Sequence, residues 1–273
     1  MSKESDSRQT SLTRKELLRQ REELLSSIKY ASFIQRAILP DKQQLDKWLN
    51  EYFIFHVPRD IVSGDFYYCT KADQYIVVAA GDCTGHGVPG ALMSIMGISF
   101  LNDIMSGPGP WKAGRILNLL RERIMKALHQ RGKHDENKDS MDMVLVVFNE
   151  ETGELQVAGA NNPLYHIRNG KLKEIRTDKM PVGINAIEEE SFTNKKIRLV
   201  PNDIIYMFSD GFADQFGGPD NKKYKYGPFR QFLTRISTDP MPEQKQKLMT
   251  EFEHWKGAYE QIDDILVMGI RFI

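Results

Sequence analysis

The pattern of apolar and polar positions separates a helical lead from a longer region of strands and helices. Within residues 11–40, apolar side chains recur at spacings of three and four, at Leu17, Leu24, Ile28, Ala31 and Ile38. Arg21 and Gln35 are polar interruptions of the same seam, and Pro40 follows it. This heptad-like pattern predicts an amphipathic linker helix that ends at the proline. It either folds back on the next domain or pairs with a second copy, and the polar residues 1–10 are expected to be disordered.

From about residue 50 the pattern changes to short runs typical of strands, separated by turn residues. Strands are expected near 52–57, 60–68, 74–82, 141–149, 154–160, 163–175 (two strands), 192–200, 203–211 and 264–273. The runs 192–200 and 203–211 are expected to form a pair joined at Pro201 and Asn202. Apolar residues at helical spacing predict helices near 89–105, 113–130, 229–236 and 242–259. The pattern therefore predicts an α+β fold in which helices cover a largely antiparallel double sheet, within one domain.

Composition narrows the range of partners and compartments. The 273 residues include 37 basic and 37 acidic side chains, so no net field favours nucleic acid. The only cysteines, Cys69 and Cys83, do not suggest a disulfide framework. No apolar run is expected to span a bilayer, and residues 1–10 lack a signal-peptide core. We therefore expect a cytoplasmic protein, whose membrane association, if any, comes from a partner or from an upstream sensor region.

Three aspartates occupy the same local setting, an apolar strand that ends or bends at an acid beside glycine. They are Asp65, Asp82 and Asp210, and the pair Asp263 and Asp264 opens the last strand. A carboxylate at the edge of a core is costly unless it is paired or binds a cation. Arg59 is the only base close in sequence, and zinc-type spacings of cysteine and histidine are missing. Oxygen ligands favour Mg²⁺ or Mn²⁺, and two such ions predict a metal-dependent phosphoester hydrolase.

The order of the acidic motifs points to a family. The runs SGDFYY, GDCTGHGVPGALMS, SDGFADQFGG and DDILVMGI, with AGANNPLYHIRNGKLKEI and PVGI between them, resemble the SpoIIE-like branch of the metal-dependent protein phosphatases. These are bacterial relatives of protein phosphatase 2C. The resemblance covers residues 54–273 and implies that 50–273 form a phosphatase domain. Its fold would be an αββα sandwich, two mainly antiparallel sheets flanked by helix pairs, with the metals in a cleft at one end.

The resemblance also implies roles for the acids. Asp82 would bridge both metals and the attacking water, and the backbone carbonyl of Cys83 would complete one coordination sphere. Asp210 and Asp263 would hold the metal on the other side, and Asp65 would act through water or on a third, weaker ion. Asp264 stays an alternative to Asp263, because neighbouring residues of a strand point to opposite faces. Tyr68 stands where the family often has a second acid, which puts the third ion in doubt, and Leu266 replaces a typical threonine.

Three other positions have two interpretations each. Arg59 either contacts the substrate phosphate or is an ordinary exposed base. His86 either acts as a general acid or orders the glycine turn and the start of the helix. Cys83 either supplies a thiolate nucleophile or contributes only its backbone, and two-metal chemistry favours the second. The run ANNPLY is interpreted as a hairpin corner whose side chains are within possible reach of substrate.

The function implied by the resemblance is that of a Mg²⁺- or Mn²⁺-dependent phosphoserine/phosphothreonine protein phosphatase of bacterial partner-switching signalling. Metal-activated water would attack phosphorus directly, because no side-chain nucleophile stands among the motifs. The expected substrate is a small phosphorylated regulator such as an anti-sigma-factor antagonist. A catalytically silent module that binds a phosphoprotein is one alternative. A metal-dependent phosphodiesterase or nucleotidase is another, and the neutral charge weighs against nucleic acid.

Overall fold

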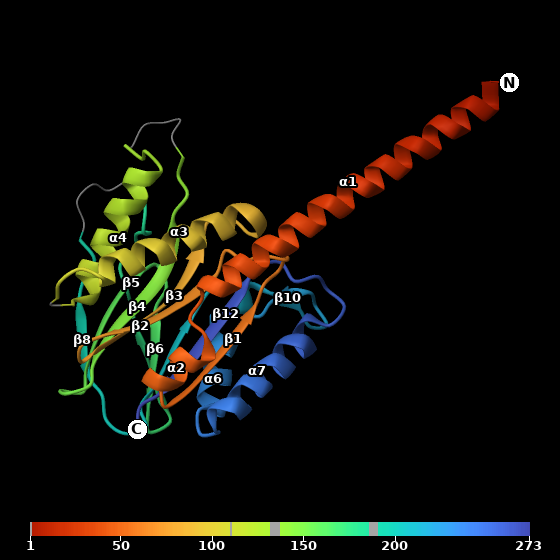
Figure 1. The fold of residues 1–273 in the computed structure, drawn as a ribbon. Coiled ribbons are helices and arrows are strands. Elements are labelled where there is room, and N and C mark those ends of the chain that lie inside the picture. The colour runs from red at the N-terminus through yellow and green to blue at the C-terminus, as the bar shows by residue number, and fades with distance from the viewer. Residues whose placement is uncertain (1, 110, 132–136, 186–190) are drawn as a thin grey trace.

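The structure is a computed structural model that describes residues 2–109, 111–131, 137–185 and 191–273, with side chains from residue 14 onward. Two five-stranded antiparallel sheets lie face to face (Figure 1). The first has the order β1 (Glu51–Val57), β12 (Ile265–Arg271), β9 (Ile204–Phe208), β6 (Leu164–Arg168) and β7 (Lys171–Ile175). The second has the order β2 (Phe66–Ala72), β3 (Tyr75–Cys83), β4 (Met141–Asn149), β5 (Glu154–Ala160) and β8 (Lys195–Arg198).

Pairs of helices cover the outer faces of the two sheets (Figure 1). The second sheet is covered by α3 (Gly87–Met105) and α4 (Ala113–Ala127). The first is covered by α6 (Tyr226–Ile236) and α7 (Met241–Lys256). A short helix, α5 (Gly211–Asp214), and the small hairpin of β10 (Phe216–Gly217) and β11 (Lys222–Lys223) follow β9. The predicted αββα sandwich is confirmed.

Alternation along the strands decides which side chains enter the space between the sheets. In β3, Val77 and Ala79 pack toward the helices, whereas Val78 and Ala80 pack against the other sheet. The same alternation applies to β12, where Leu266 and its alternate residues face inward. Leu266, in the place of a typical threonine, is thus a fully buried packing residue.

Helix α3 is apolar enough over its 19 residues to cross a membrane by length and composition alone, which the sequence interpretation did not expect. Half of this apolar window is buried inside the fold, where α3 contacts α4, β2 and β3. Residues such as Ile98 and Leu101 lie in the core between the helix and the second sheet. The composition of α3 therefore follows from its position against the sheet.

A single long helix, α1 (Ser2–Ile38), forms the lead, and its N-terminal part projects away from the domain (Figure 1). The expectation of disorder for residues 1–10 is wrong for 2–10, which are helical. Residues 2–38 contain neither glycine nor proline, so a helix anchored at its C-terminal end continues without interruption. Ser32 and Gln35 are buried against the domain, whereas Leu17 and Leu24 are more than 60% exposed. Only the last turns of α1 therefore pack on the domain. The pairing of α1 with a second copy remains a prediction.

Two local expectations were wrong. Residues 60–65 form a loop, and β2 begins only at Phe66, because the buried carboxylate of Asp264 binds backbone N–H groups in that loop. The strands β8 and β9 belong to different sheets and are not a hairpin. The chain therefore crosses from the second sheet to the first between β8 and β9. The buried Asp203 stabilises this crossing by accepting hydrogen bonds from Arg168 and from the backbone of Val200.

An additional helix, α2 (Lys42–Trp48), lies between α1 and β1 and was not predicted. It begins with a capping box, in which Asp41 accepts the N–H of Gln44 and the Gln44 side chain accepts the N–H of Asp41. A helix of seven residues is too short to show a clear apolar periodicity, so the capping box is the main indication of it in the sequence.

Candidate active site

Strand alternation gathers acidic side chains at one end of the sandwich. Asp82, near the end of β3, lies on the same face of the strand as the inward-facing Val78 and Ala80. Asp142, at the start of β4, lies directly opposite Asp82 in the sheet register. Asp65, Asp210, Asp263 and Asp264 come from segments that border β2, β9 and β12. The four predicted acidic motifs therefore meet at a common edge of the two sheets.

Asp65 is deeply buried, with 2% of its surface exposed. The hydroxyl of Ser209 donates a hydrogen bond to its carboxylate, and the same hydroxyl accepts the N–H of Leu266 at 2.9 Å. Burial raises the pKa of Asp65, and the charge of Asp82 raises it further. Asp65 is thus held from the first sheet by Ser209 while it faces the acids of the second sheet.

Asp82, Asp210 and Asp263 repel one another in this pocket. Burial raises the pKa of Asp82, and the charges of Asp210 and Asp263 add to the effect. Burial together with Asp263 raises the pKa of Asp210 to about 6. Burial also raises the pKa of Asp263. Clustered carboxylates with raised pKa values are typical of a functional site, and here they indicate a place that favours positive charge.

The structure separates the two adjacent acids of the last motif. Asp264 is 2% exposed and accepts the backbone N–H groups of Arg59 and Gly64, each at 2.7 Å. Asp263 is partly exposed, and its charge acts on Asp82 and Asp210. Asp264 therefore fixes the loop that carries Asp65, and Asp263 is the member of the pair that belongs with the repelling acids.

Comparison with known proteins agrees with this arrangement. The family model for stage II sporulation protein E (SpoIIE) matches residues 72–273. The chain belongs to the SpoIIE family. Among curated proteins, it is 24% identical over 199 residues to phosphoserine phosphatase RsbU of Bacillus subtilis, over 71% of this chain. That match spans 55% of RsbU, so the chain corresponds to about half the length of this relative.

Solved structures of PP2C phosphatase domains share the fold of this SpoIIE-family chain. The SiaA-PP2C domain of Pseudomonas aeruginosa matches with a TM-score of 0.83 and 30% identity, over 93% of this chain and 98% of that domain. The PP2C phosphatase domain of SpoIIE from Bacillus subtilis, solved with a fragment of its regulatory domain, has a TM-score of 0.65 at 18% identity. It covers 81% of this chain and 63% of that structure. The second likeness concerns the fold alone.

PP2C-family phosphatases depend on metal ions, and the acids of this SpoIIE-family domain fit hard divalent cations. The donors are carboxylate oxygens, and the pKa shifts indicate that a positive charge would relieve their repulsion. Among the described residues, no three acidic, histidine or cysteine side chains converge as a ready-made metal site. The fit to such ions therefore rests on the oxygen donors and on their mutual repulsion.

The segment that follows Asp82 contains Cys83, whose backbone and thiol have different surroundings. Gly64 packs so closely that an added Cβ would lie 3.4 Å from the Cys83 carbonyl and 2.6 Å from that of Gly85. The thiol lies in the core between the second sheet and its helices, and burial raises its pKa well above the ordinary value. The thiol therefore stays protonated, which argues against a thiolate nucleophile.

The two predicted substrate contacts, Arg59 and His86, border the acids. Burial raises the pKa of Asp263, and the charges of His86 and Arg59 oppose that shift, so both lie near it. The Arg59 guanidinium donates to the Ile262 carbonyl at 3.0 Å, and the His86 ring lies 2.9 Å from the Asp60 carboxylate. His86 makes no side-chain bond to the N-terminus of α3, so the proposed ordering of that helix start does not come from such a cap.

Tyr68, which replaces a family acid, is buried among the residues that face the helices. Two positions near the acids were missed. Asp142 carried a weak signal, because it is an acid inside an apolar strand, at a position that alternation places on the inward-facing side. Tyr226 had no sequence signal; burial raises the pKa of its hydroxyl, as do the charges of Asp210 and Asp82. Asp142 and Tyr226 thus belong to the surroundings of the candidate active site.

Proposed function

We propose that this chain is a Mg²⁺- or Mn²⁺-dependent phosphoserine/phosphothreonine protein phosphatase. One observation carries the proposal: buried and mutually repelling carboxylates from four separate motifs meet at one end of a PP2C-type sandwich. Such a cluster has little other use in a folded protein, because each buried charge destabilises the fold unless a cation accompanies it.

The position of each acid suggests which ion it would hold. Asp82, whose pKa responds to the charges of Asp210 and Asp263, would contribute to both ions, and Asp210 and Asp263 would hold the ion on the other side. The Cys83 carbonyl would complete one coordination sphere, and Asp65 would act through water or on a third, weaker ion. When bound, the ions would activate water and stabilise the charge that develops on phosphorus oxygens. Arg59 and His86, on the Asp263 side, would orient the phosphate.

The partner proposed for this domain is a phosphorylated regulatory protein in a partner-switching system, in the cytoplasm. This rests on likeness to the phosphoserine phosphatase RsbU and on the shared fold with the RsbU and RsbW domains of Rv1364c from Mycobacterium tuberculosis. The second of these is 18% identical with a TM-score of 0.63, so it supports the architecture alone. An anti-sigma-factor-antagonist-like protein is the expected substrate, and a membrane sensor region further upstream is compatible with the projecting α1 (Figure 1).

A panel of substrates tests the reaction against its alternatives. Phosphate release is measured from phosphoserine and phosphothreonine peptides, and from cyclic and linear nucleotides, with Mn²⁺, with Mg²⁺ and with EDTA. The proposal expects metal-dependent release from the peptides alone. Release only from nucleotides would favour a phosphodiesterase or nucleotidase. Mn²⁺ binding by calorimetry without turnover of any phosphopeptide would favour a silent binding module.

A homodimer through α1 is proposed as the regulatory form. Leu17, Leu18 and Leu24 are each about half or more exposed on the projecting part of the helix, and a second helix would cover them. Light scattering at micromolar concentration should give a dimer, and Leu24→Glu should give a monomer. A wild-type monomer would contradict this proposal without affecting the catalytic one.

A further inference from the structure

The corner between β5 and β6 is connected to the acids through Asp142. Asn161, which follows β5, adopts a left-handed backbone with φ 59°. Its side-chain amide donates a hydrogen bond of 2.8 Å to the carboxylate of Asp142. Asp142 is the cross-strand neighbour of Asp82. The corner is therefore connected to the centre of the site by one hydrogen bond and one step across the sheet.

The segment that begins at Asp178 is fixed against this corner. The backbone N–H of Asn161 donates to the Asp178 carbonyl at 2.8 Å, and the N–H of Asp178 donates to the Gly159 carbonyl at 3.1 Å. The Asp178 carboxylate accepts both the N–H and the hydroxyl of Thr193. Four residues further on, Val182 pairs with Met141, the residue before Asp142. Lys179 thus projects from a backbone that is anchored on both sides.

Lys179 is exposed, and no hydrogen bond or ion pair holds its side chain among the residues that the structure describes. Its charge nevertheless reaches the site. Burial raises the pKa of Asp142, and the Asn161 hydrogen bond and the charge of Lys179 both oppose that rise. By contrast, Lys223, near Asp210 on the other side, is paired with Asp214 at 2.7 Å.

A second observation at the corner indicates spare capacity for a ligand. The side chain of Asn162 is 8% exposed, and its amide nitrogen has no hydrogen-bond partner in the described part of the chain. Buried donors are normally satisfied by protein, water or a bound group. The segments at this corner therefore carry both an unused buried donor, in Asn162, and an unpaired cation, in Lys179.

The net charge of the site indicates that a cation such as Lys179 is needed near a bound phosphate. The site holds six carboxylates, those of Asp65, Asp82, Asp142, Asp210, Asp263 and Asp264. Two divalent ions would balance four of these charges. A phosphate monoester close to its dianionic form would then approach a site that is still negative, so cations are needed around it.

We infer that Lys179 is a substrate-binding residue that contacts the phosphate group from the β5–β6 corner, next to Asp142, in the cleft of the proposed phosphatase. This rests on the proposed function. Its ammonium group donates to a phosphate oxygen, and the Asp142–Asn161 pair keeps the adjoining backbone in place. The contact is made to substrate and transition state alike, so it contributes mainly to binding.

The experiment compares Lys179→Met with Lys179→Arg and with the control Lys173→Met, an exposed lysine of β7 that pairs with His166 in the middle of β6. With Mn²⁺ and para-nitrophenyl phosphate, Lys179→Met should raise KM about tenfold, the loss expected for one charge-assisted hydrogen bond, with kcat within about threefold. Lys179→Arg and Lys173→Met should stay within about twofold. An unchanged KM in Lys179→Met, or an equal rise in Lys179→Arg, would overturn the inference.

A binding measurement separates this inference from the proposed function. Titration of inorganic phosphate into the Mn²⁺-loaded protein is followed by calorimetry, which needs no turnover. Lys179→Met should weaken phosphate binding about tenfold, and equal affinity in wild type and Lys179→Met would contradict the inference. A wild type that releases no phosphate from any substrate would defeat the proposed function, while the titration would still decide the role of Lys179.

Discussion

The different roles of Asp263 and Asp264 lead to a matched pair of substitutions. Asp264 accepts two buried N–H groups, each at 2.7 Å, from Arg59 and Gly64. Asparagine at this position keeps one acceptor oxygen and places an amide donor against the other N–H. One unsatisfied buried donor costs about 1–3 kcal/mol, and the loss of charge from the remaining bond costs about 1 kcal/mol more. We therefore expect Asp264→Asn to lower the free energy of unfolding by about 2–4 kcal/mol.

Asp263→Asn is the matched control. Within the described part of the chain, the Asp263 carboxylate accepts only the N–H of Asp264, at 2.9 Å, and asparagine keeps that acceptor. Its raised pKa means that its negative charge destabilises the metal-free fold at neutral pH, so stability should stay equal or rise.

Urea denaturation at pH 7 in EDTA measures both variants without the contribution of bound metal. For a domain of this size, the loss in Asp264→Asn corresponds to a fall in Tm on the order of 10 °C. With metal restored, Asp263→Asn should lose Mn²⁺-dependent activity despite its stability. If Asp263→Asn unfolds as easily as Asp264→Asn, the assignment of the two acids is wrong.

Three further predictions concern pH, the thiol and the linker helix. Burial and the charge of Asp263 raise the pKa of Asp210 to about 6, so the folded protein keeps the Asp210 carboxyl protonated at a higher pH than the unfolded chain does. Protonation of Asp210 therefore stabilises the fold at low pH, and this stabilisation is lost as pH rises from about 4 to 7. In EDTA, Asp210→Asn should therefore gain stability relative to wild type over that range by urea denaturation; a constant difference would refute it. Cys83→Ala should keep kcat within a few-fold, because the thiol faces the core, and a loss of more than a hundredfold would restore the thiolate interpretation. Gln35→Ala should lower Tm and alter kcat/KM, because Gln35 bonds the backbone of Ser63 and the hydroxyl of Ser94; unchanged values in both assays would rule out coupling through this contact.

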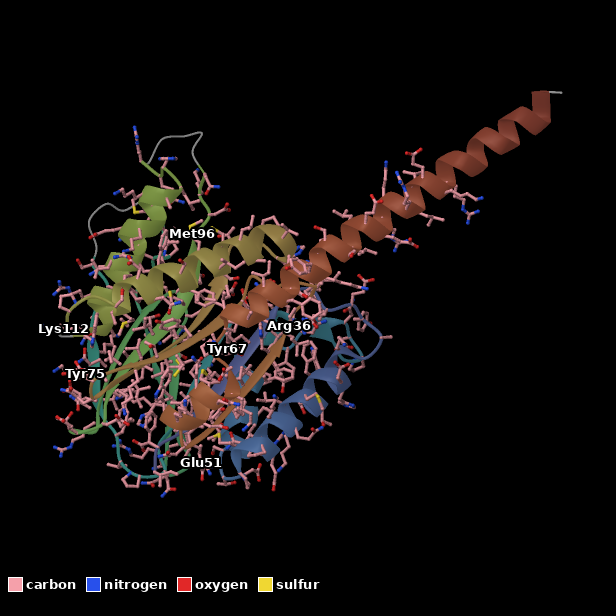
Figure 2. All side chains as sticks on the ribbon, in the orientation of Figure 1. Arg36, Glu51, Tyr67, Tyr75, Met96 and Lys112 are labelled. Atoms are coloured by element: carbon pink, nitrogen blue, oxygen red, sulfur yellow. The ribbon has the colours of Figure 1, made fainter. Side chains whose placement is uncertain are left out.

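Figure 2 shows Arg36, beside Gln35 in the chain, where α1 reaches the domain, with Tyr67 of β2 below it. At this junction Gln35 was predicted as a polar interruption of a dimer seam. It is instead 6% exposed and accepts the N–H of Ser63, two residues before Asp65. A heptad pattern reports which residues share one face of a helix, but it does not say what that face contacts. The docking of α1 therefore lay outside what periodicity can determine.

The sandwich itself was largely predictable, because apolar runs such as 141–149 and 154–160 coincide with β4 and β5. Local signals failed where distant residues decide the structure. The loop before β2 depends on Asp264, about 200 positions away, and the crossing from β8 to β9 depends on Asp203 and Arg168. Asp142 was overlooked because it has no glycine beside it, and its importance comes from its register opposite Asp82.

The central claim is that Asp82 belongs to a metal-dependent phosphatase centre. Its most direct test is phosphate release from a phosphoserine peptide as Mn²⁺ is titrated into wild type, Asp82→Asn and the control Asp73→Asn, an exposed turn residue. Wild type and Asp73→Asn should share one Mn²⁺-dependent rate, and Asp82→Asn should lose at least about a thousandfold, the scale of losing a principal catalytic group. Equal rates in wild type and Asp82→Asn would contradict it.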